Sequence, residues 1–299
     1  MDKTTRQETI AIVGFGDIGE RLSSLLPRPQ WHCFGLRRSA NAVPQGVESV
    51  AIDLRNAHSL SVLEKLRPDA LVIALSPADR SAEAYQAGFA EAMANIIAGL
   101  GEHRPRAAFF VSSTRVYRES SEAWIDEGSD TADSDPHVAA ILAAEQIFLE
   151  GIDSAVVLRA GGLYGSGPGP LLKRVAAGKL TAKEPPRYAN RIHRDDVAGF
   201  MAAALTGKIT LDQRIVNLVD DAPAPLQDLE SWLCTQLGLS YEPPHSAPSG
   251  ETPLHKRISN ERLRSSGYTL QYPDYRKGYA EVLHRWMAHS EREDGLDLH

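Results

Sequence analysis

A glycine-rich turn near the start of the chain has the spacing that binds the diphosphate of a dinucleotide. Gly14, Gly16 and Gly19 form the pattern G-x-G-x-x-G between an apolar run at 9–13 and an amphipathic helical pattern. The first glycine permits a tight turn, the second lets a diphosphate approach the backbone, and the third lets the helix pack close to the strand. The start of that helix adds free N–H groups and the positive end of its dipole.

The sequence therefore predicts a dinucleotide site. Its expected residues are Gly14, Phe15, Gly16, Asp17, Ile18 and Gly19. The alternative is a glycine-rich turn between strand and helix in a flavodoxin-like fold that binds no nucleotide.

Two arginines bear on which dinucleotide would bind. NAD sites usually place an Asp or Glu after the second strand, where it accepts hydrogen bonds from the ribose hydroxyls. Residues 21–47 contain no acidic residue, and the apolar run at 31–36 is followed instead by Arg37 and Arg38. A guanidinium suits the 2′-phosphate of NADP, which a carboxylate would repel. We predict NADP rather than NAD, although Arg38 alone could also be a solvated loop charge.

These residues need a parallel sheet to position them. Apolar runs at 9–13, 31–36, 47–52, 70–75, 107–112 and 154–158 read as strands, and helical patterns at 18–26, 59–66, 82–100 and 136–149 lie between them. Strands that alternate with crossover helices predict an α/β fold with a Rossmann-type, doubly wound parallel sheet and helices on both faces.

The composition of the chain changes after Arg159. Residues 161–170 are rich in Gly and Pro, and further prolines occur at 185–186, 223–225 and 243–253. We expect a dinucleotide-binding domain at 1–160 and a smaller substrate-binding part at 161–299, with a strand at 215–219 that returns to the sheet.

Composition and charge exclude several classes of function. The 32 Lys and Arg residues against 39 Asp and Glu residues give a net charge of −7, which disfavours nucleic acid or an anionic membrane as the partner. The two cysteines and scattered histidines lack the spacing of metal ligands. No apolar stretch is long enough to span a membrane, and the N-terminus does not resemble a signal peptide. We expect a cytoplasmic protein without a metal site, either a monomer or a homodimer.

Five further segments come after the glycine turn in a characteristic order. They are Asp53-Leu54, Leu75-Ser76, V-S-S-T-R-V-Y at 111–117, L-R-A-G-G-L-Y-G at 158–165 and R-I-H-R-D-D-V-A at 191–198. Together with the turn they resemble the extended and atypical short-chain dehydrogenase/reductases, often called the NAD-dependent epimerase/dehydratase family. The resemblance implies the Rossmann-type fold over most of the chain, through about Tyr279.

The resemblance also implies roles for individual residues. The residues expected beside the cofactor are Asp53, Leu54, Leu75, Ser76, Ser112, Gly161 and Leu163. The residues expected at the substrate are Tyr164, Arg191 and His193, of which the last two would suit a phosphate or carboxylate. From the residue pattern itself, Asp195 is expected to cap a helix at 197–205.

The chain departs from this family in its acid/base residues. The family uses a Tyr followed four residues later by a Lys that lowers the tyrosine pKa. In the helix at 136–149 these positions hold His137 and Ile141. No Lys occurs between Lys65 and Lys173 and no Tyr between Tyr117 and Tyr164, so no shift of register restores the pair.

Three residues are candidates to replace the lost pair. Ser113 matches the serine or threonine that orients substrate in the family, or it caps local backbone. Tyr117 could reach the same cleft, or it packs under the loop. His137 could act as an acid or base near neutral pH, or it occupies the first turn of its helix without chemistry.

These observations leave three hypotheses. The first is an NADP-dependent oxidoreductase or sugar-nucleotide epimerase/dehydratase-like enzyme that acts on a small molecule such as a nucleotide sugar, without the usual Tyr–Lys pair. The second is a non-catalytic NADP-binding sensor or scaffold. The third is a reductase with an unusual proton donor such as His137. The fold alone does not decide among them.

Overall fold

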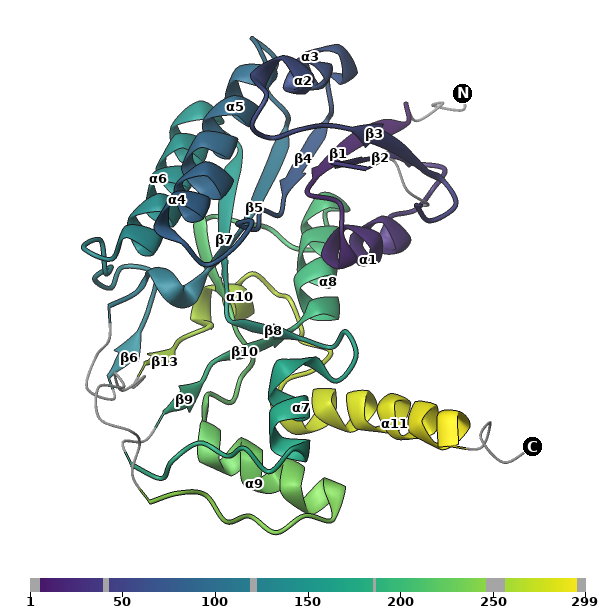
Figure 1. Cartoon of the computed structure of the whole chain (residues 1–299). Coiled ribbons are helices and arrows are strands. Elements are labelled where there is room, and N and C mark those ends of the chain that lie inside the picture. Colours follow the sequence, from purple (N-terminus) through teal and green to yellow (C-terminus); the bar gives the residue numbers. More distant parts are fainter. Residues whose placement is uncertain (1–5, 40–42, 119–122, 185–186, 246–255, 295–299) are drawn as a thin grey trace.

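The centre of the molecule is a sheet of seven parallel strands in the order β11-β7-β5-β4-β1-β2-β3 (Figure 1). The computed structural model describes residues 6–39, 43–118, 123–184, 187–245 and 256–294. The strands are β1 (Glu8–Val13), β2 (Trp31–Arg37), β3 (Val47–Ala51), β4 (Ala70–Ile73), β5 (Ala107–Ser113), β7 (Ala155–Ala160) and β11 (Ile215–Leu218). The predicted Rossmann-type parallel sheet is confirmed.

The strand order reverses beside β1, which lies between β4 and β2. In open parallel sheets, ligands bind in the crevice that such a reversal opens at the carboxyl ends of the strands. The glycine turn comes directly after β1, so the fold places it at that crevice.

Helices cover both faces of the sheet because alternate side chains of its strands are apolar on both sides. One face, with Ile10 and Ile12, packs against α1 (Asp17–Leu25) and α8 (Arg194–Leu205). The other face, with Ala11 and Val13, packs against the remaining helices of the first half. These helices are α2 (Ala57–Leu60), α3 (Val62–Leu66), α4 (Ala82–Tyr85), α5 (Ala92–Gly99) and α6 (Pro136–Gly151).

Two predicted helices are interrupted. The helix expected at 59–66 is the pair α2 and α3, and the one expected at 82–100 contains a π-helical segment at Gln86–Glu91 between α4 and α5. Gly88 lies in this segment against Pro77, where an added Cβ would be 2.9 Å from the proline Cα. Such π segments widen a helix locally and recur beside functional sites.

The chain after β7 builds a second, smaller layer below the sheet (Figure 1). Its helices α7 (Gly169–Ala176), α9 (Leu226–Leu237) and α11 (Tyr275–Asp294) share a separate apolar cluster, and α10 (Glu261–Ser265) packs near β11. Short strand pairs join this layer to the sheet: β8 (Gly162–Tyr164) with β10 (Arg191–His193), β9 (Tyr188–Ala189) with β12 (Ala224–Pro225), and β6 (Trp124–Ile125) with β13 (Arg257–Ile258).

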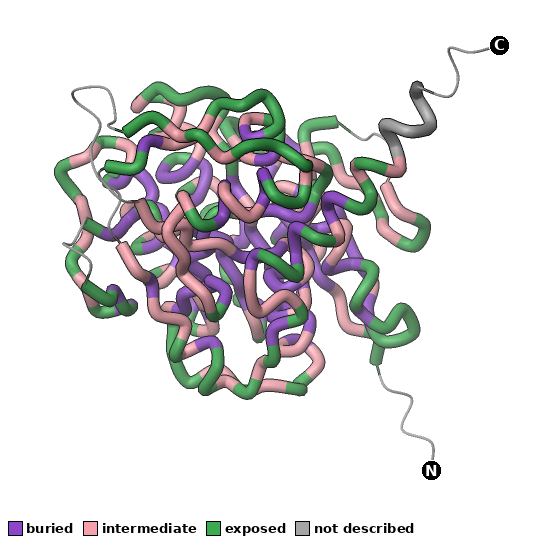
Figure 2. Tube along the Cα trace, turned by 90° about the horizontal axis from the view of Figure 1, so that it is seen from below, coloured by how far each residue is buried: buried purple, intermediate pink, exposed green. Residues whose placement is uncertain are grey.

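Burial reflects this arrangement. The buried segments run through the middle of the molecule, and the exposed segments lie around its periphery (Figure 2). In the described ranges, no helix combines the length and apolar character needed to cross a bilayer. The same ranges contain no group of three His, Cys, Asp or Glu side chains arranged to hold a metal ion.

Candidate cofactor site

A cavity of about 330 Å³ lies at the carboxyl ends of the central strands and joins the glycine turn to the serines after β5. Nine of the residues expected at the cofactor line it: Gly14, Gly16, Asp17, Ile18, Leu75, Ser76, Ser112, Gly161 and Leu163. Ser113 also lines it, together with Ala74, Phe89, Val111, Ala160 and Arg194. The cavity therefore brings together residues from sequence segments that are far apart.

The glycine turn is shaped for close approach of a ligand. Gly14 has a φ of +76°, and a Cβ there would lie 2.0 Å from the Ala74 carbonyl oxygen, so only glycine fits. At Gly16, an added Cβ would meet no atom closer than 3.9 Å, because that side of the residue is open. Gly16 is the N-cap of α1, and no side chain caps this helix. Its first N–H groups are thus available to an anion, which fits a dinucleotide diphosphate.

Phe15 and Gly19 support the turn from behind. The Phe15 ring is buried, and an added Cβ at Gly35 of β2 would lie 2.8 Å from it. An added Cβ at Gly19 would lie 3.0 Å from both this ring and Ile12. These contacts bring α1 close to the strands, which is the packing role expected of the third glycine.

The residues expected at the adenosine end are Arg37, the last residue of β2, and residues that come after β2 and β3; all of them lie outside the lining of the cavity. Arg37 is half-buried, and its guanidinium has no hydrogen-bond or ion-pair partner within the described part of the chain. Arg38 is exposed. Asp53 accepts hydrogen bonds from the N–H and the Nε of Arg55, and Leu54 packs partly buried on the core.

Adjacent serines at the end of β5 use their hydroxyl groups differently. Ser112 donates its proton to Glu145 Oε1 at 2.5 Å, and this buried carboxylate also binds Arg159. Ser113 Oγ accepts a hydrogen bond from the Arg115 N–H at 3.1 Å. Among the described residues, no acceptor takes the hydroxyl proton of Ser113, so it can be donated to an oxygen in the cavity.

Tyr117 and His137 lie elsewhere. Tyr117 is buried under Arg159, and its hydroxyl donates to Asn217 Oδ1 at 2.7 Å, so it packs under the loop as one alternative foresaw. The His137 ring contacts Asp135 Oδ1 at 2.8 Å and the Arg80 carbonyl oxygen at 3.0 Å. Ile141 is buried in the core. None of these three side chains lines the cavity.

The residues expected at the substrate are largely enclosed. Tyr164 is buried and stacks on Tyr279, with ring centroids 4.7 Å apart. His193 is completely buried, and burial lowers its pKa to about 4. Arg191 is half-buried beside Tyr279, and its Nε has no hydrogen-bond partner in the described ranges.

The expectation that Asp195 caps a helix is wrong. Helix α8 begins at Arg194, directly after β10, and its N-cap is His193, whose Nδ1 accepts from the Asp195 N–H at 3.2 Å. The Asp195 carboxylate pairs instead with Arg21 of α1. The helix starts earlier than predicted because the strand leads directly into it.

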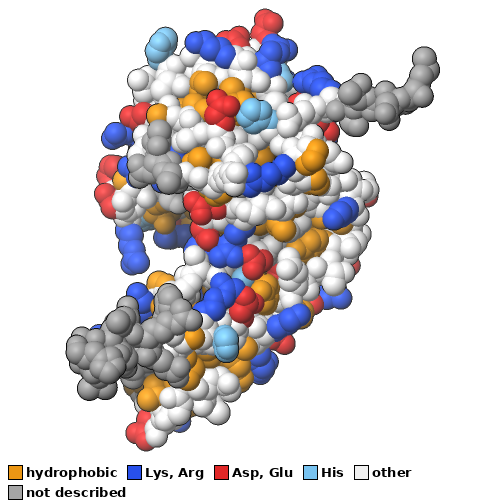
Figure 3. Space-filling view, turned by 90° about the vertical axis from the view of Figure 1, so that its right-hand side faces the viewer, with side chains coloured by type: hydrophobic (Ala, Val, Ile, Leu, Met, Phe, Trp, Pro, Cys, Tyr) orange, Lys and Arg blue, Asp and Glu red, His pale blue; other side chains and the backbone are white. Residues whose placement is uncertain are grey.

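Charged side chains of both signs link α1 to α8. Arg21 binds Asp17, and Asp17 also binds Arg194 at 2.9 Å. Burial alone would raise the pKa of Asp17, but its bonds to Arg194 and Arg21 outweigh this and hold that pKa below its usual value. Acidic and basic side chains lie side by side across the middle of the face drawn in Figure 3. Arg194 was not predicted from the sequence. The feature that could have identified it is that a cation occupies the variable position of the I-H-x-D-D segment.

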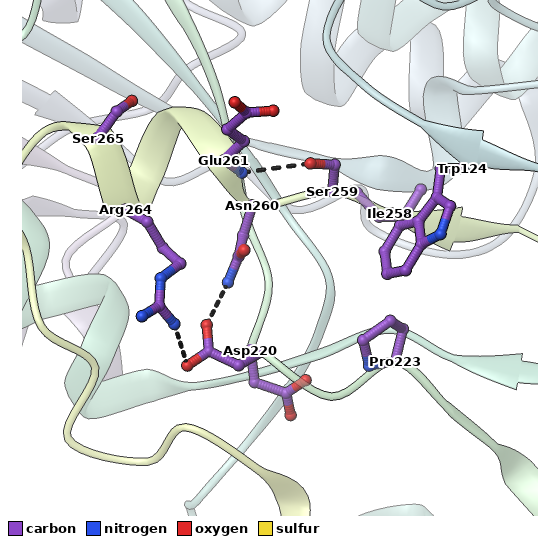
Figure 4. Close-up of a pocket in the computed structure, with 10 residues that line it drawn as sticks. Trp124, Asp220, Pro223, Ile258, Ser259, Asn260, Glu261, Arg264 and Ser265 are labelled. Carbon is purple, nitrogen blue, oxygen red and sulfur yellow. Dashed lines mark hydrogen bonds and ion pairs between the residues drawn. The ribbon is translucent and has the colours of Figure 1, made fainter.

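A second cavity of about 440 Å³ lies where β11 ends (Figure 4). Trp124 and Pro223 lie on one side of it, and Asn260 and Arg264 lie on the other. Asn260 and Arg264 bind the carboxylate of Asp221 at 2.7 Å and 2.5 Å. Asp220 lines this cavity, and burial raises its pKa to about 8. Sequence reasoning did not select these residues.

Comparisons with known proteins agree with this architecture. The model of the NAD-dependent epimerase/dehydratase family matches residues 10–218. A search of curated proteins finds no match. Among solved structures, a Methylobacillus flagellatus protein provisionally named an NAD-dependent epimerase/dehydratase is 33% identical, with a TM-score of 0.76, over 93% of this chain and 98% of its own.

Two more distant structures bear on the fold alone. The Thermotoga maritima UDP-glucose 4-epimerase with UDP-glucose is 13% identical, has a TM-score of 0.77, and matches over 94% of this chain and 99% of its own. The Bordetella bronchiseptica enzyme WbmG in complex with NAD is 14% identical, has a TM-score of 0.76, and matches over 96% of this chain and 97% of its own.

Proposed function

Because the chain belongs to the NAD-dependent epimerase/dehydratase family, we propose that it binds NADP(H) at the glycine turn and transfers hydride to or from a small-molecule carbonyl or alcohol. The observation that carries the proposal is the cavity that joins the open N-terminus of α1 to Ser113. When bound, the nicotinamide donates or accepts the hydride. The chain's own residues hold the two reactants and polarise the substrate oxygen.

Arg37 supports NADP as the cofactor. A half-buried guanidinium without a protein partner in the described ranges, at the carboxyl end of β2, can bind a 2′-phosphate without first giving up an ion pair. The acid-free interval at 21–47 leaves no carboxylate for the ribose hydroxyls that NAD presents there. The solved relatives with bound NAD are about 14% identical, so they do not decide the preference of this chain.

Ser113 supports reaction at an oxygen-bearing carbon. Its proton is free to donate, whereas the proton of Ser112 is bound to Glu145. Reduction of a carbonyl would add a hydride from the nicotinamide to carbon and a proton from solvent to oxygen, and Ser113 can hold that oxygen by donating a hydrogen bond to it. A nucleotide sugar is the first substrate class to test, because the chain belongs to the epimerase/dehydratase family, for which the sequence motifs imply a sugar-nucleotide substrate.

One observation favours the second function, a non-catalytic NADP-binding sensor. Ile141 is buried, and both ring nitrogens of His137 have protein partners, so neither position of the usual Tyr–Lys pair presents an acid to the cavity. General acid–base assistance contributes roughly 10²–10⁴-fold to a rate, so an enzyme without it turns over slowly.

Titration and a substrate screen test the two functions. We expect calorimetry to show tighter binding of NADPH than of NADH, and nucleotide sugars with a keto group to be reduced slowly with loss of NADPH absorbance. Ser113→Ala should lower kcat and leave NADPH affinity unchanged. Binding without turnover across the screen would favour the sensor, and failure to bind either cofactor would exclude both functions.

A further inference from the structure

One wall of the cofactor cavity comes from the C-terminal part of the chain. Arg194, the first residue of α8, lines the cavity beside the glycine turn that comes after β1. Its Nη1 donates to Asp17 Oδ2 at 2.9 Å. Two parts of the chain that are distant in sequence therefore meet at the place where a diphosphate would bind.

Arg194 is held in place without using all of its donors. Its Nε is buried and has no hydrogen-bond partner in the described residues. A buried donor without a partner is unfavourable, and native structures nearly always supply one from protein, water or ligand. Arg194 lines the cavity and its side chain is 28% exposed, so the exposed part of its guanidinium, rather than the buried Nε, can bind an acceptor supplied by a ligand there.

The neighbouring Arg21 differs in this respect. Its Nε binds Asp17, its Nη1 binds Asp195, and its Nη2 donates to the Gly165 carbonyl oxygen at 3.2 Å. All of its nitrogens therefore have partners. Of the two arginines bound to Asp17, Arg194 is the one that can take a new anion without losing an existing bond.

The charge of Asp17 makes such a residue necessary. Asp17 stands in the first turn of α1, where its carboxylate repels an incoming diphosphate. A guanidinium between the two anions cancels that repulsion and can bind both, because its donors point in several directions.

We propose that Arg194 is a diphosphate-binding residue that closes over the glycine turn, with Asp17 holding its guanidinium in position. The inference rests on the proposed dinucleotide site and adds to it a ligand from the C-terminal part of the chain. A dinucleotide then contacts both parts at once. A purely structural Arg194 would instead act only by tying α8 to α1 through Asp17.

Two variants separate these roles when each is titrated with NADPH. Arg194→Met removes the cation, and we expect NADPH to bind about tenfold to a hundredfold more weakly. Asp17→Asn removes the repelling charge but keeps an amide oxygen that can still accept the Arg194 hydrogen bond and hold the guanidinium in position, so NADPH should bind as tightly as to wild type or more tightly. If Arg194 acts only through Asp17, the two variants should weaken binding equally.

A fragment of the cofactor and a control variant test whether the loss of NADPH affinity in Arg194→Met comes from the diphosphate. Adenosine 2′-monophosphate lacks the diphosphate, so Arg194→Met should leave its affinity unchanged. Arg106→Met removes an arginine that pairs with Glu8 at the amino end of the sheet, far from the cavity, and NADPH affinity should not change. Arg194→Lys keeps the charge and should recover part of the loss, and it replaces Arg194→Met should that variant fail to fold.

The outcomes also separate this inference from the proposed function. If wild type binds neither NADPH nor NADH, the proposed function fails. If wild type binds NADPH and Arg194→Met or Arg194→Lys binds it equally well under conditions of low salt, the proposed function stands and the role of Arg194 is overturned. Weakened binding in Asp17→Asn, equal to that in the Arg194 variants, would likewise overturn it.

Discussion

Helices α1 and α6 cover the same sheet, yet they begin in opposite ways. Helix α1 begins after Gly16 with no side-chain cap, and its first N–H groups face the cavity. Helix α6 begins after Asp135, whose Oδ1 accepts from the His137 N–H at 2.8 Å, with Pro136 in its first turn. The open start suits a ligand, and the capped start is complete without one.

The same contrast extends to side chains near these helices. The Arg37 guanidinium and Arg194 Nε have no protein partners in the described ranges. Both ring nitrogens of His137 have partners, and Ile141 is buried. The two arginines with open groups are thus residues that could bind the cofactor, whereas the polar groups at the start of α6, where the family's catalytic pair was expected, are satisfied.

The largest effect should come from filling the open side of the glycine turn. Gly16 has an extended backbone with φ of −133°, which valine tolerates, and an added Cβ meets only open space. We expect Gly16→Val to fold normally, as thermal unfolding would show, and to bind NADPH about a hundredfold or more weakly, because the side chain takes the place of the diphosphate. Gly128→Val, at an exposed turn, is the matched control. Wild-type affinity in Gly16→Val would mean that the turn binds no cofactor.

A smaller effect is expected at the other end of the cofactor. Arg37→Met should weaken NADPH binding about tenfold to a hundredfold while NADH affinity changes little, because one charge-assisted contact to the 2′-phosphate is lost. Calorimetric titration of both cofactors measures this ratio. Arg38→Met, at an exposed position, should change it less. Equal wild-type affinity for the two cofactors would contradict the prediction.

The glycine turn at the uncapped start of α1 could be predicted from local sequence. Glycine spacing and strand periodicity locate Gly14 and Gly16, because a tight turn and a buried strand each impose residue types on a short segment. They do not show which distant residues meet. Arg194 reaches Asp17 through the packing of α8 on α1, and Asp195 pairs with Arg21 rather than capping its helix. Both contacts depend on tertiary structure.

The cap of α6 should matter for stability and not for binding. Asp135→Ala should lower the free energy of unfolding by about 1 kcal/mol near neutral pH, a usual value for a lost N-cap, and leave NADPH affinity unchanged.

The contribution of Asp135 to stability should depend on pH. Burial alone would raise the pKa of Asp135, but hydrogen bonds from His137 outweigh burial and hold that pKa below its ordinary value. The stabilisation from its charge is therefore present above that ordinary value and is lost as the pH falls through the lowered pKa. Urea unfolding should show the difference between the two proteins narrowing in acid.

The smallest effect on function is expected at His137. This residue tests most directly whether a polar group whose hydrogen bonds are all made within the protein takes no part in function. Its ring nitrogens contact Asp135 and the Arg80 carbonyl oxygen, and its ring packs edge-on against Tyr85 with centroids 4.8 Å apart. Phenylalanine keeps the packing and removes the titratable group. We expect His137→Phe to retain wild-type NADPH affinity and, with any substrate that turns over, the wild-type dependence of kcat/KM on pH.

If His137 has become the proton donor, His137→Phe should remove most of the rate, together with the pH dependence of the wild type. That result would show that a histidine with both nitrogens bonded in the free protein exchanges a partner for substrate. A flat profile in both proteins, with kcat lowered by Ser113→Ala alone, would exclude His137 as the proton donor and support Ser113 as the residue that holds the substrate oxygen.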